Sequence, residues 1–152
     1  MTGLKSEFLG VLHIRVAASY EIGVGPTGRR RIDVFEGGTF LGPRIHATIV
    51  DGTDVLRLCD GGIAQPNVRL ILETEDGAAI FVSYRGIRHA SADVMDRIAS
   101  EVAMPESHEY YLRNAIFFET GAENYTWLNR VLAVGVGRRS PRQADYDVYE
   151  IL

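Results

Sequence analysis

Polar side chains that interrupt apolar, strand-like segments are the residues of this chain that are best suited to take part in catalysis or binding. Inside a fold, each would need a hydrogen-bonding partner, an opposite charge or a ligand, because a buried polar group without one costs free energy. They are Arg69, Glu73, Tyr84, Tyr111, Arg113, Glu119, Trp127 and Asn129. Aromatic walls with a few convergent polar groups are typical of small-molecule sites. The alternative is an ion-pair network between strands, or outer faces in contact with solvent.

Glu119 is the residue we expect to transfer a proton. It follows the apolar segment 116–118 and precedes Thr120-Gly121, where a strand would end at the mouth of a barrel. Burial raises the pKa of a carboxylate in such a place and a nearby guanidinium lowers it, so the group can serve as an acid or a base. Arg113 and Arg69 are the expected catalytic cations, since a guanidinium can hold a developing oxyanion.

The substrate-binding residues that we expect are mostly aromatic or amide-bearing. Trp127, the only tryptophan, stands among hydrogen-bonding neighbours and could be a core plug or a cavity wall. We favour the wall, because Asn129 on the same strand face would need a polar partner if it were buried. The set that the strand pattern indicates is Tyr84, Tyr111, Trp127, Asn129 and Glu73. Arg69, Tyr84, Arg113, Glu119, Trp127 and Asn129 are predicted to surround one cavity.

A hairpin with the turn Asp76-Gly77 positions several of these residues. Asp-Gly between two strand-like segments predicts a two-residue turn with positive φ at both central positions. That turn would place Arg69 opposite Tyr84, so that Arg69 and Glu73 share a face with Tyr84. Both faces of the hairpin would then be partly apolar, as in the wall of a barrel.

Alternating apolar residues separated by glycine-rich turns predict an all-β fold. The expectation is a single antiparallel β-barrel domain over residues 1–152, lipocalin-like in outline, with about eight to ten strands. One short helix is predicted over residues 91–103, with Ser91 as its N-cap and Val94, Ile98 and Val102 on its apolar face. The predicted strands are 7–17, 30–35, 42–50, 54–59, 67–75, 78–86, 110–120, 127–139 and 144–152.

Composition and charge narrow the classes of partner. A net charge of −4 argues against nucleic acid, which requires clustered cations. The single cysteine, Cys59, and the lack of a signal peptide or an apolar span of membrane length predict a cytoplasmic protein that does not bind membranes. The histidines have no metal-ligand spacing, so neither a metal nor another cofactor is expected.

The chain resembles a known family. The segments "GGTFLGPRIHATIVDGTD", "NVRLILETEDGAAIFVSYRGIRH" and "FETGAENYTWLNR" are similar to domain-of-unknown-function family 3237, also called uncharacterised protein family 0311. The resemblance implies a small β-barrel with one helix, often a homodimer. It also places Asp54, in Gly52-Thr53-Asp54, among the substrate-binding candidates. The chain departs from the family pattern at Val55, Asn67 and Leu112.

The function that the residues and the resemblance together favour is cofactor-independent acid–base catalysis. The reaction would be that of a lyase, cyclase or isomerase, such as ring closure through a C–O bond, on a small aromatic or polyketide-like molecule. The alternative is a non-catalytic barrel that binds a small hydrophobic ligand. A carboxylate inside the cavity favours the enzyme, and a dry apolar cavity favours the binding protein.

Overall fold

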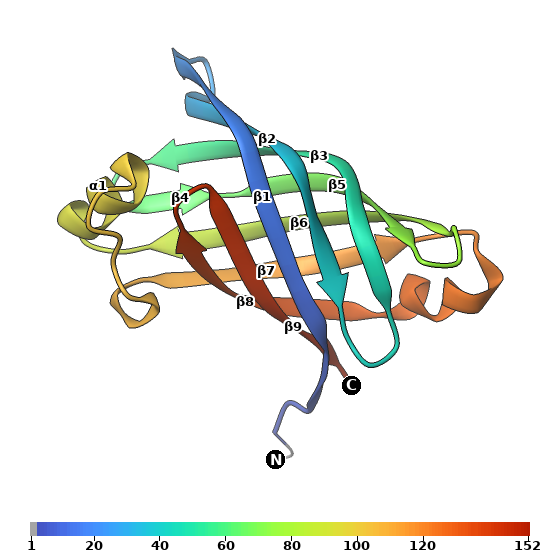
Figure 1. Ribbon diagram of the computed structural model, residues 1–152. Coiled ribbons are helices and arrows are strands. Elements are labelled where there is room, and N and C mark those ends of the chain that lie inside the picture. The colour runs from blue at the N-terminus through green and yellow to red at the C-terminus, as the bar shows by residue number, and fades with distance from the viewer. Residues whose placement is uncertain (1–2) are drawn as a thin grey trace.

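The computed structural model describes residues 3–152 and contains one antiparallel sheet that closes on itself (Figure 1). Eight strands follow one another around the barrel in the order β2-β1-β9-β8-β7-β6-β5-β3, and β3 pairs with β2 to close it. The short strand β4 (Ile63–Gln65) is an addition that pairs with both β3 and β6. The predicted antiparallel barrel of eight to ten strands is confirmed. The barrel strands are β1 (Ser6–Gly25), β2 (Gly28–Leu41), β3 (His46–Cys59), β5 (Asn67–Thr74), β6 (Ala79–His89), β7 (Tyr111–Glu119), β8 (Leu132–Ser140) and β9 (Gln143–Ile151).

Helices lie at the two ends of the barrel (Figure 1). Helix α1 (Ala92–Ser100) and the 3-10 helix η1 (Ser107–Glu109) connect β6 to β7 at one end. The 3-10 helix η2 (Glu123–Arg130) connects β7 to β8 at the other end. The Ser91 side chain caps α1 by accepting a hydrogen bond from the backbone N–H of Val94, as expected. The helix is shorter than predicted, because Glu101 takes a left-handed conformation (φ 57°) that ends it.

The hairpin between β5 and β6 has a different turn from the predicted one. The backbone N–H of Thr74 donates to the carbonyl of Ala78, and Gly77 (φ 85°) donates to the carbonyl of Thr74. Three residues therefore form the turn, with only Gly77 in the left-handed region, and Arg69 pairs with Ser83 instead of Tyr84. A shift of one residue in the register moves every side chain to the opposite face. As a result, Arg69 and Glu73 lie outside, while Tyr84 lies inside.

Two long strands bend to close the barrel at their bulges. The pairing of β1 with β2 shifts register between Arg15 and Val16. Gly38 stands near this region with φ 140°, and a Cβ atom there would lie 1.9 Å from the carbonyl oxygen of His13. Only glycine allows that close approach of two strands. The predicted strands 42–50 and 54–59 are one continuous strand, β3, with a register shift between Ile49 and Asp51.

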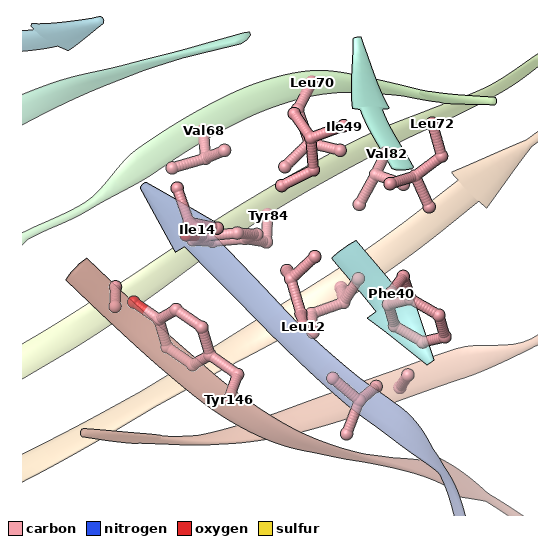
Figure 2. Packing of buried hydrophobic residues seen from close by; sticks show 14 of the residues in the cluster. Leu12, Ile14, Phe40, Ile49, Val68, Leu70, Leu72, Val82, Tyr84 and Tyr146 are labelled. Atoms are coloured by element: carbon pink, nitrogen blue, oxygen red, sulfur yellow. The ribbon is translucent and has the colours of Figure 1, made fainter. Parts of the chain in front are cut away.

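The interior is apolar in the half nearer η2. Alternate residues of the strands pack there, as Figure 2 shows for Leu12, Phe40, Leu72 and Val82. Phe40 and Phe118 meet edge to face, with ring centroids 6.1 Å apart. Each of these side chains is buried, and an eight-stranded barrel is just narrow enough for side chains to fill it. The half of the interior nearer α1 differs, because polar and charged side chains also point into it.

Candidate functional site

Polar and charged residues occupy the inner face of the barrel toward α1. Strand β2 contributes an arginine and an aspartate, β3 an aspartate, β6 a tyrosine and an arginine, β8 an arginine, and β9 a tyrosine. The residues are Arg31, Asp33, Asp54, Tyr84, Arg88, Arg139 and Tyr146, which line one inner cavity of about 20 Å³. Their strands place them on the same inward face as the apolar core, further toward the α1 end.

A larger cavity of about 740 Å³ opens from this inner cavity toward α1. Its walls come from β1, β2, β3, β6, β8 and one face of α1, including Met95 and Ile98. Arg31, Arg88 and Arg139 line both cavities, so the guanidinium groups stand at the junction between them. The volume falls within the range of about 300–1,000 Å³ that is typical of small-molecule sites.

Asp54 is the carboxyl group of the inner cavity best suited to acid–base chemistry. Burial raises its pKa to about 6, and the neighbouring Asp33 adds to the increase. A hydrogen bond from the backbone N–H of Asn67, at 2.9 Å, and the charges of Arg139 and Arg88 oppose the increase. A carboxyl group with a pKa near neutrality can both accept and return a proton.

Asp33 differs from Asp54, because both oxygens of its carboxylate accept hydrogen bonds from side chains. Ser19 Oγ donates to Asp33 Oδ1 at 2.6 Å, and Arg31 Nη2 donates to Oδ2 at 3.3 Å. Arg31 Nε also lies 3.2 Å from Oδ1. The side chain of Asp33 is buried and positioned by these contacts, so it acts as a fixed negative charge beside Asp54.

Arg88 and Arg139 are cations with no carboxylate partner within 4.0 Å among residues 3–152. Burial lowers the pKa of Arg88 to about 10, and the neighbouring Arg139 and Arg31 lower it further. The side chain still has its charge at neutral pH. Among the residues described, the Nε atoms of Arg88 and Arg139 are buried and lack hydrogen-bond partners.

Tyr84 and Tyr146 complete the inner cavity. Their ring centroids lie 5.4 Å apart at an angle of 57°, and Figure 2 shows both side chains beside Ile14 in the interior. Burial raises the pKa of Tyr146 to about 12 and that of Tyr84 well above 10. Both side chains therefore remain neutral phenols that can donate a hydrogen bond.

The structure does not bring the predicted site residues together. Of that set, Asp54 and Tyr84 line the inner cavity. Arg69, Glu73 and Glu119 are exposed on the outer face of the barrel. The expectation that Glu119 stands at the mouth of the cavity is wrong, because its strand alternates outward at that position while Phe118 and Thr120 are buried.

Arg113 and Tyr111 also point outward, into a separate groove of about 450 Å³ on the outer surface. The Arg113 guanidinium lies 4.9 Å from the centre of the Tyr111 ring, and its Nη1 donates to the carbonyl of Leu112. Val55 and Asn67, two of the departures from the family pattern, line the same groove, whereas Leu112 lines the inner cavity. The groove and the inner cavity lie on opposite faces of the sheet.

Trp127 and Asn129 belong to η2, not to the strand predicted over 127–139, and they lie at the end opposite α1. Trp127 is half-buried against the core, under the Arg44 guanidinium at 3.9 Å from the ring centre. Asn129 Oδ1 accepts from the backbone N–H of Thr120, and its Nδ2 donates to the carbonyl of Thr120. Asn129 thus finds its polar partner in the backbone, and the predicted cavity wall is a cover over the apolar end.

Sequence reasoning missed Arg31, Asp33, Arg88, Arg139 and Tyr146. A signal for them exists, because each stands an even number of residues from a buried apolar residue on the same strand, as Asp33 does from Phe35 and Tyr146 from Val148. Because side chains alternate between the two faces of a strand, a polar residue at an even spacing from a core residue also points inward. That signal needs the correct face of each strand, which the register sets.

Two further properties concern metals and membranes. Within residues 3–152, no group of three or more His, Cys, Asp or Glu side chains is arranged to hold a metal ion. In the same part of the chain, no helix has both the length and the apolar character needed to cross a membrane.

The fold and the cavity define a closed antiparallel β-barrel protein with a charged chamber at one end. The chain belongs to the family described as "Protein of unknown function (DUF3237)", whose model matches residues 4–151. A UPF0311 protein of Rhodopseudomonas palustris is 28% identical over 151 residues, which cover 98% of this chain and 97% of the relative. A crystal structure of a conserved protein of unknown function from the same species has a TM-score of 0.92 at 26% identity and covers 100% of each chain.

Two other relatives extend the comparison. The crystal structure of a β-barrel-like protein from Acinetobacter baumannii is 31% identical, with a TM-score of 0.84 and coverage of 100% of this chain and 98% of that one. The hydroalkoxylation enzyme phnH of Penicillium herquei is 25% identical over 129 residues, which cover 85% of this chain and 71% of the enzyme. An enzyme is thus among the relatives of this chain.

Proposed function

We propose that the protein is a cofactor-independent acid–base enzyme that closes a ring by adding a hydroxyl group across a carbon–carbon double bond. The observation that supports this most strongly is Asp54, a carboxyl group with a pKa of about 6 in a cavity that is also lined by the guanidinium groups of Arg31, Arg88 and Arg139. The similarity to a hydroalkoxylation enzyme favours this reaction among those open to an acid–base pair. The substrate is a small aromatic or polyketide-like molecule.

The proposed reaction begins with ionised Asp54 as the general base. Asp54 accepts the proton of the substrate hydroxyl as its oxygen attacks the β-carbon of a double bond conjugated with a carbonyl. The π electrons move onto the carbonyl oxygen, and the enolate that forms is stabilised by a guanidinium of the Arg88 and Arg139 pair. The proton then returns from Asp54 to the α-carbon. One O–H bond and one π bond are replaced by a C–O bond and a C–H bond, and Asp54 regains its charge.

The other side chains of the chamber have supporting roles in this proposal. Asp33, held by Arg31 and Ser19, keeps a negative charge beside Asp54 and so favours the protonated form of Asp54 after proton transfer. Tyr84 and Tyr146 are neutral donors that can orient the carbonyl or the hydroxyl oxygen. A non-catalytic barrel for hydrophobic ligands is less well supported, because the chamber is lined by charged groups.

A ring-closure assay tests the proposal. The probe is 2′-hydroxychalcone, whose phenol adds to its enone to give a flavanone, followed by the loss of the chalcone absorbance. The wild-type protein is expected to accelerate the reaction over buffer, and Asp54→Asn is expected to lower the rate by about 100-fold or more. Glu119→Gln, an exposed carboxylate on the outer face, is the matched control. No acceleration for chalcones that bind the protein would contradict the proposal and favour the ligand-binding barrel.

The proposal includes assembly as a homodimer. Apolar side chains that are exposed on the outside of neighbouring strands β5 to β8 support it, since adjacent exposed apolar residues mark protein contacts. These are Ile71, Phe81, Phe117 and Leu132, and the pairs Ile71–Phe81 and Phe117–Leu132 are direct cross-strand neighbours. Light scattering of the purified protein measures the oligomeric state.

A further inference from the structure

The two guanidinium groups at the junction of the cavities have no partner of opposite charge among residues 3–152. Arg88 is 4% exposed, and neither Arg88 nor Arg139 has a carboxylate within ion-pair distance in residues 3–152. Their buried Nε atoms also have no hydrogen-bond partner among those residues. Burying a cation without a partner is costly, so the buried Arg88, with the half-buried Arg139 beside it, indicates that a ligand supplies the missing acceptors.

The local charges leave room for an anion. Arg31 is paired with Asp33. Asp54 is the other carboxyl group of the inner cavity, and it accepts a hydrogen bond from Asn67. One developing enolate during ring closure would require one cation, and two are present. The pair therefore has one positive charge more than the enolate offsets, and this charge can stabilise an anionic group of the substrate in the same reaction.

The larger cavity, which opens toward α1, also has more positive than negative side chains. Its lining includes five arginines (Arg29, Arg31, Arg88, Arg139 and Arg142) and three carboxylates (Glu21, Asp96 and Glu101). Glu21 accepts from Arg29 at 3.0 Å, and Glu101 accepts from the backbone N–H of Arg142 at 2.9 Å. A cleft with one dominant sign of charge concentrates ligands of the opposite sign.

We propose that Arg88 and Arg139 form an anion-binding subsite and that the substrate is an organic carboxylate. The inference rests on the proposed function, because it names the substrate class of the same chamber. A planar carboxylate matches the fork of a guanidinium and can accept two hydrogen bonds from it. Bound there, it would fill the acceptor positions that the protein leaves open, and the attached aromatic or unsaturated group would occupy the larger cavity toward α1.

Calorimetric titration with matched probes tests the subsite. The probes are trans-cinnamate, its neutral analogue cinnamamide, and phenyl phosphate, which separates a carboxylate site from a phosphate site. Wild-type protein is expected to bind cinnamate at least tenfold more tightly than either of the others. Arg139→Gln is expected to abolish that preference. Arg138→Gln is the matched control, since Arg138 is the next residue, points outward and pairs with Asp147 at 3.1 Å.

Several outcomes would overturn the inference. Equal binding of cinnamate and cinnamamide would show that no anion subsite exists. Tighter binding of phenyl phosphate would assign the subsite to phosphate instead. Equal losses in Arg139→Gln and Arg138→Gln would show that only the net charge matters.

A stability measurement gives a second test that needs no ligand of known identity. Arg88→Met keeps the length of the side chain and removes the unpaired buried cation. Its Tm without ligand is expected to rise by about 2 °C or more, because a cation held for a ligand destabilises the empty protein. Cinnamate should raise the Tm of the wild type and leave that of Arg88→Met unchanged. A lower Tm for Arg88→Met would assign Arg88 a structural role and overturn the inference.

Asp54→Asn distinguishes failure of this inference from failure of the proposed function. If both hold, the variant loses ring closure and still binds cinnamate with the dependence on Arg139. Arg139-dependent binding in a protein that closes no ring would retain the anion subsite and reject the catalytic proposal. Ring closure that depends on Asp54, without any preference for cinnamate over cinnamamide, would do the reverse.

Discussion

Asp33 and Asp54 lie directly opposite each other on the neighbouring strands β2 and β3, with both side chains in the inner cavity. Like charges at directly opposed positions of a sheet destabilise it. The pair persists because the two groups have different surroundings. Arg31 forms an ion pair with Asp33 and Ser19 donates a hydrogen bond to it, whereas burial, with a smaller contribution from Asp33, raises the pKa of Asp54. The two carboxyl groups are thereby separated into a fixed charge and a group that can exchange a proton.

Stability should depend on pH through Asp54. Its pKa is raised from 3.8 to about 6 on folding, so the folded protein binds an extra proton between these values. The stabilisation associated with protonated Asp54 is fully present below about pH 4 and is lost as the pH rises through 6. The loss should be on the order of 3 kcal/mol. Urea unfolding of the wild type and Asp54→Asn between pH 4 and 7.5 measures it as the change in their difference.

The direction of this change is the decisive feature. The wild type should lose stability relative to Asp54→Asn as the pH increases. A difference that stays constant over the range would mean that Asp54 titrates normally in the folded protein, and the assignment of a buried acid–base group would then be withdrawn.

The rate of ring closure should show the same group in its pH profile. If ionised Asp54 is the base, kcat/KM rises with pH, is half-maximal near pH 6 and reaches a plateau above it, because this ratio reports groups of the free enzyme. The rising limb should be absent from the residual activity of Asp54→Asn. An unchanged limb in that variant would assign the titration to another group.

The hairpin between β5 and β6 shows why the sequence predicted the fold better than the site. Period-2 alternation and turn residues were sufficient for the strands, because each is a local property. The face of each strand depends on the register, and the Asp76-Gly77 turn is compatible with two loop lengths. With the loop one residue longer than predicted, Arg69 and Glu73 moved from the interior to the outer face.

Asp54 and Trp127 also show that the sequence pattern does not reveal contacts between residues on different elements. Asp54 entered the predicted set through the family resemblance, and its raised pKa results from burial inside the barrel and from Asp33 on the neighbouring strand. Trp127 was predicted on a strand, but residues 123–130 form a 3-10 helix. Asn129 stabilises that helix by bonding to the backbone of Thr120, a tertiary contact that alternation cannot reveal.

Glu119→Gln should leave catalysis and folding nearly unchanged. The side chain is exposed at the end of β7, on the opposite face from the inner cavity. Surface substitutions of this kind alter stability by about 0.5 kcal/mol or less. Rates of ring closure and urea midpoints for the variant and the wild type test this. A loss of rate of about 100-fold would return Glu119 to the role that the sequence indicates for it.

Phe117→Glu should separate the proposed homodimer. Phe117 is 55% exposed and lies beside Leu132 on the outer face, where a charge would be buried in the contact. Light scattering should show the mass of a monomer for this variant and that of a dimer for the wild type. Val24→Glu, at an apolar position that is 84% exposed at the tip of the β1–β2 hairpin, is the control for an added negative charge. A dimeric Phe117→Glu variant would place the contact elsewhere.

Arg44→Ala should weaken the barrel at the end opposite the chamber. Arg44 Nη2 donates to Glu150 Oε1 at 2.8 Å, and its guanidinium also lies over the Trp127 ring. Glu150 is only 8% exposed, so removal of Arg44 would leave a buried carboxylate without its cation. The expected loss is about 2 kcal/mol at pH 7 by urea unfolding. Ring closure per folded molecule should be unchanged, because the inner cavity and the larger cavity lie toward α1, at the other end of the barrel. The double variant with Glu150→Gln should recover part of the stability, since the unpaired charge is then absent. If it recovers none, the stacking of Arg44 on Trp127, and not the ion pair, holds this end closed.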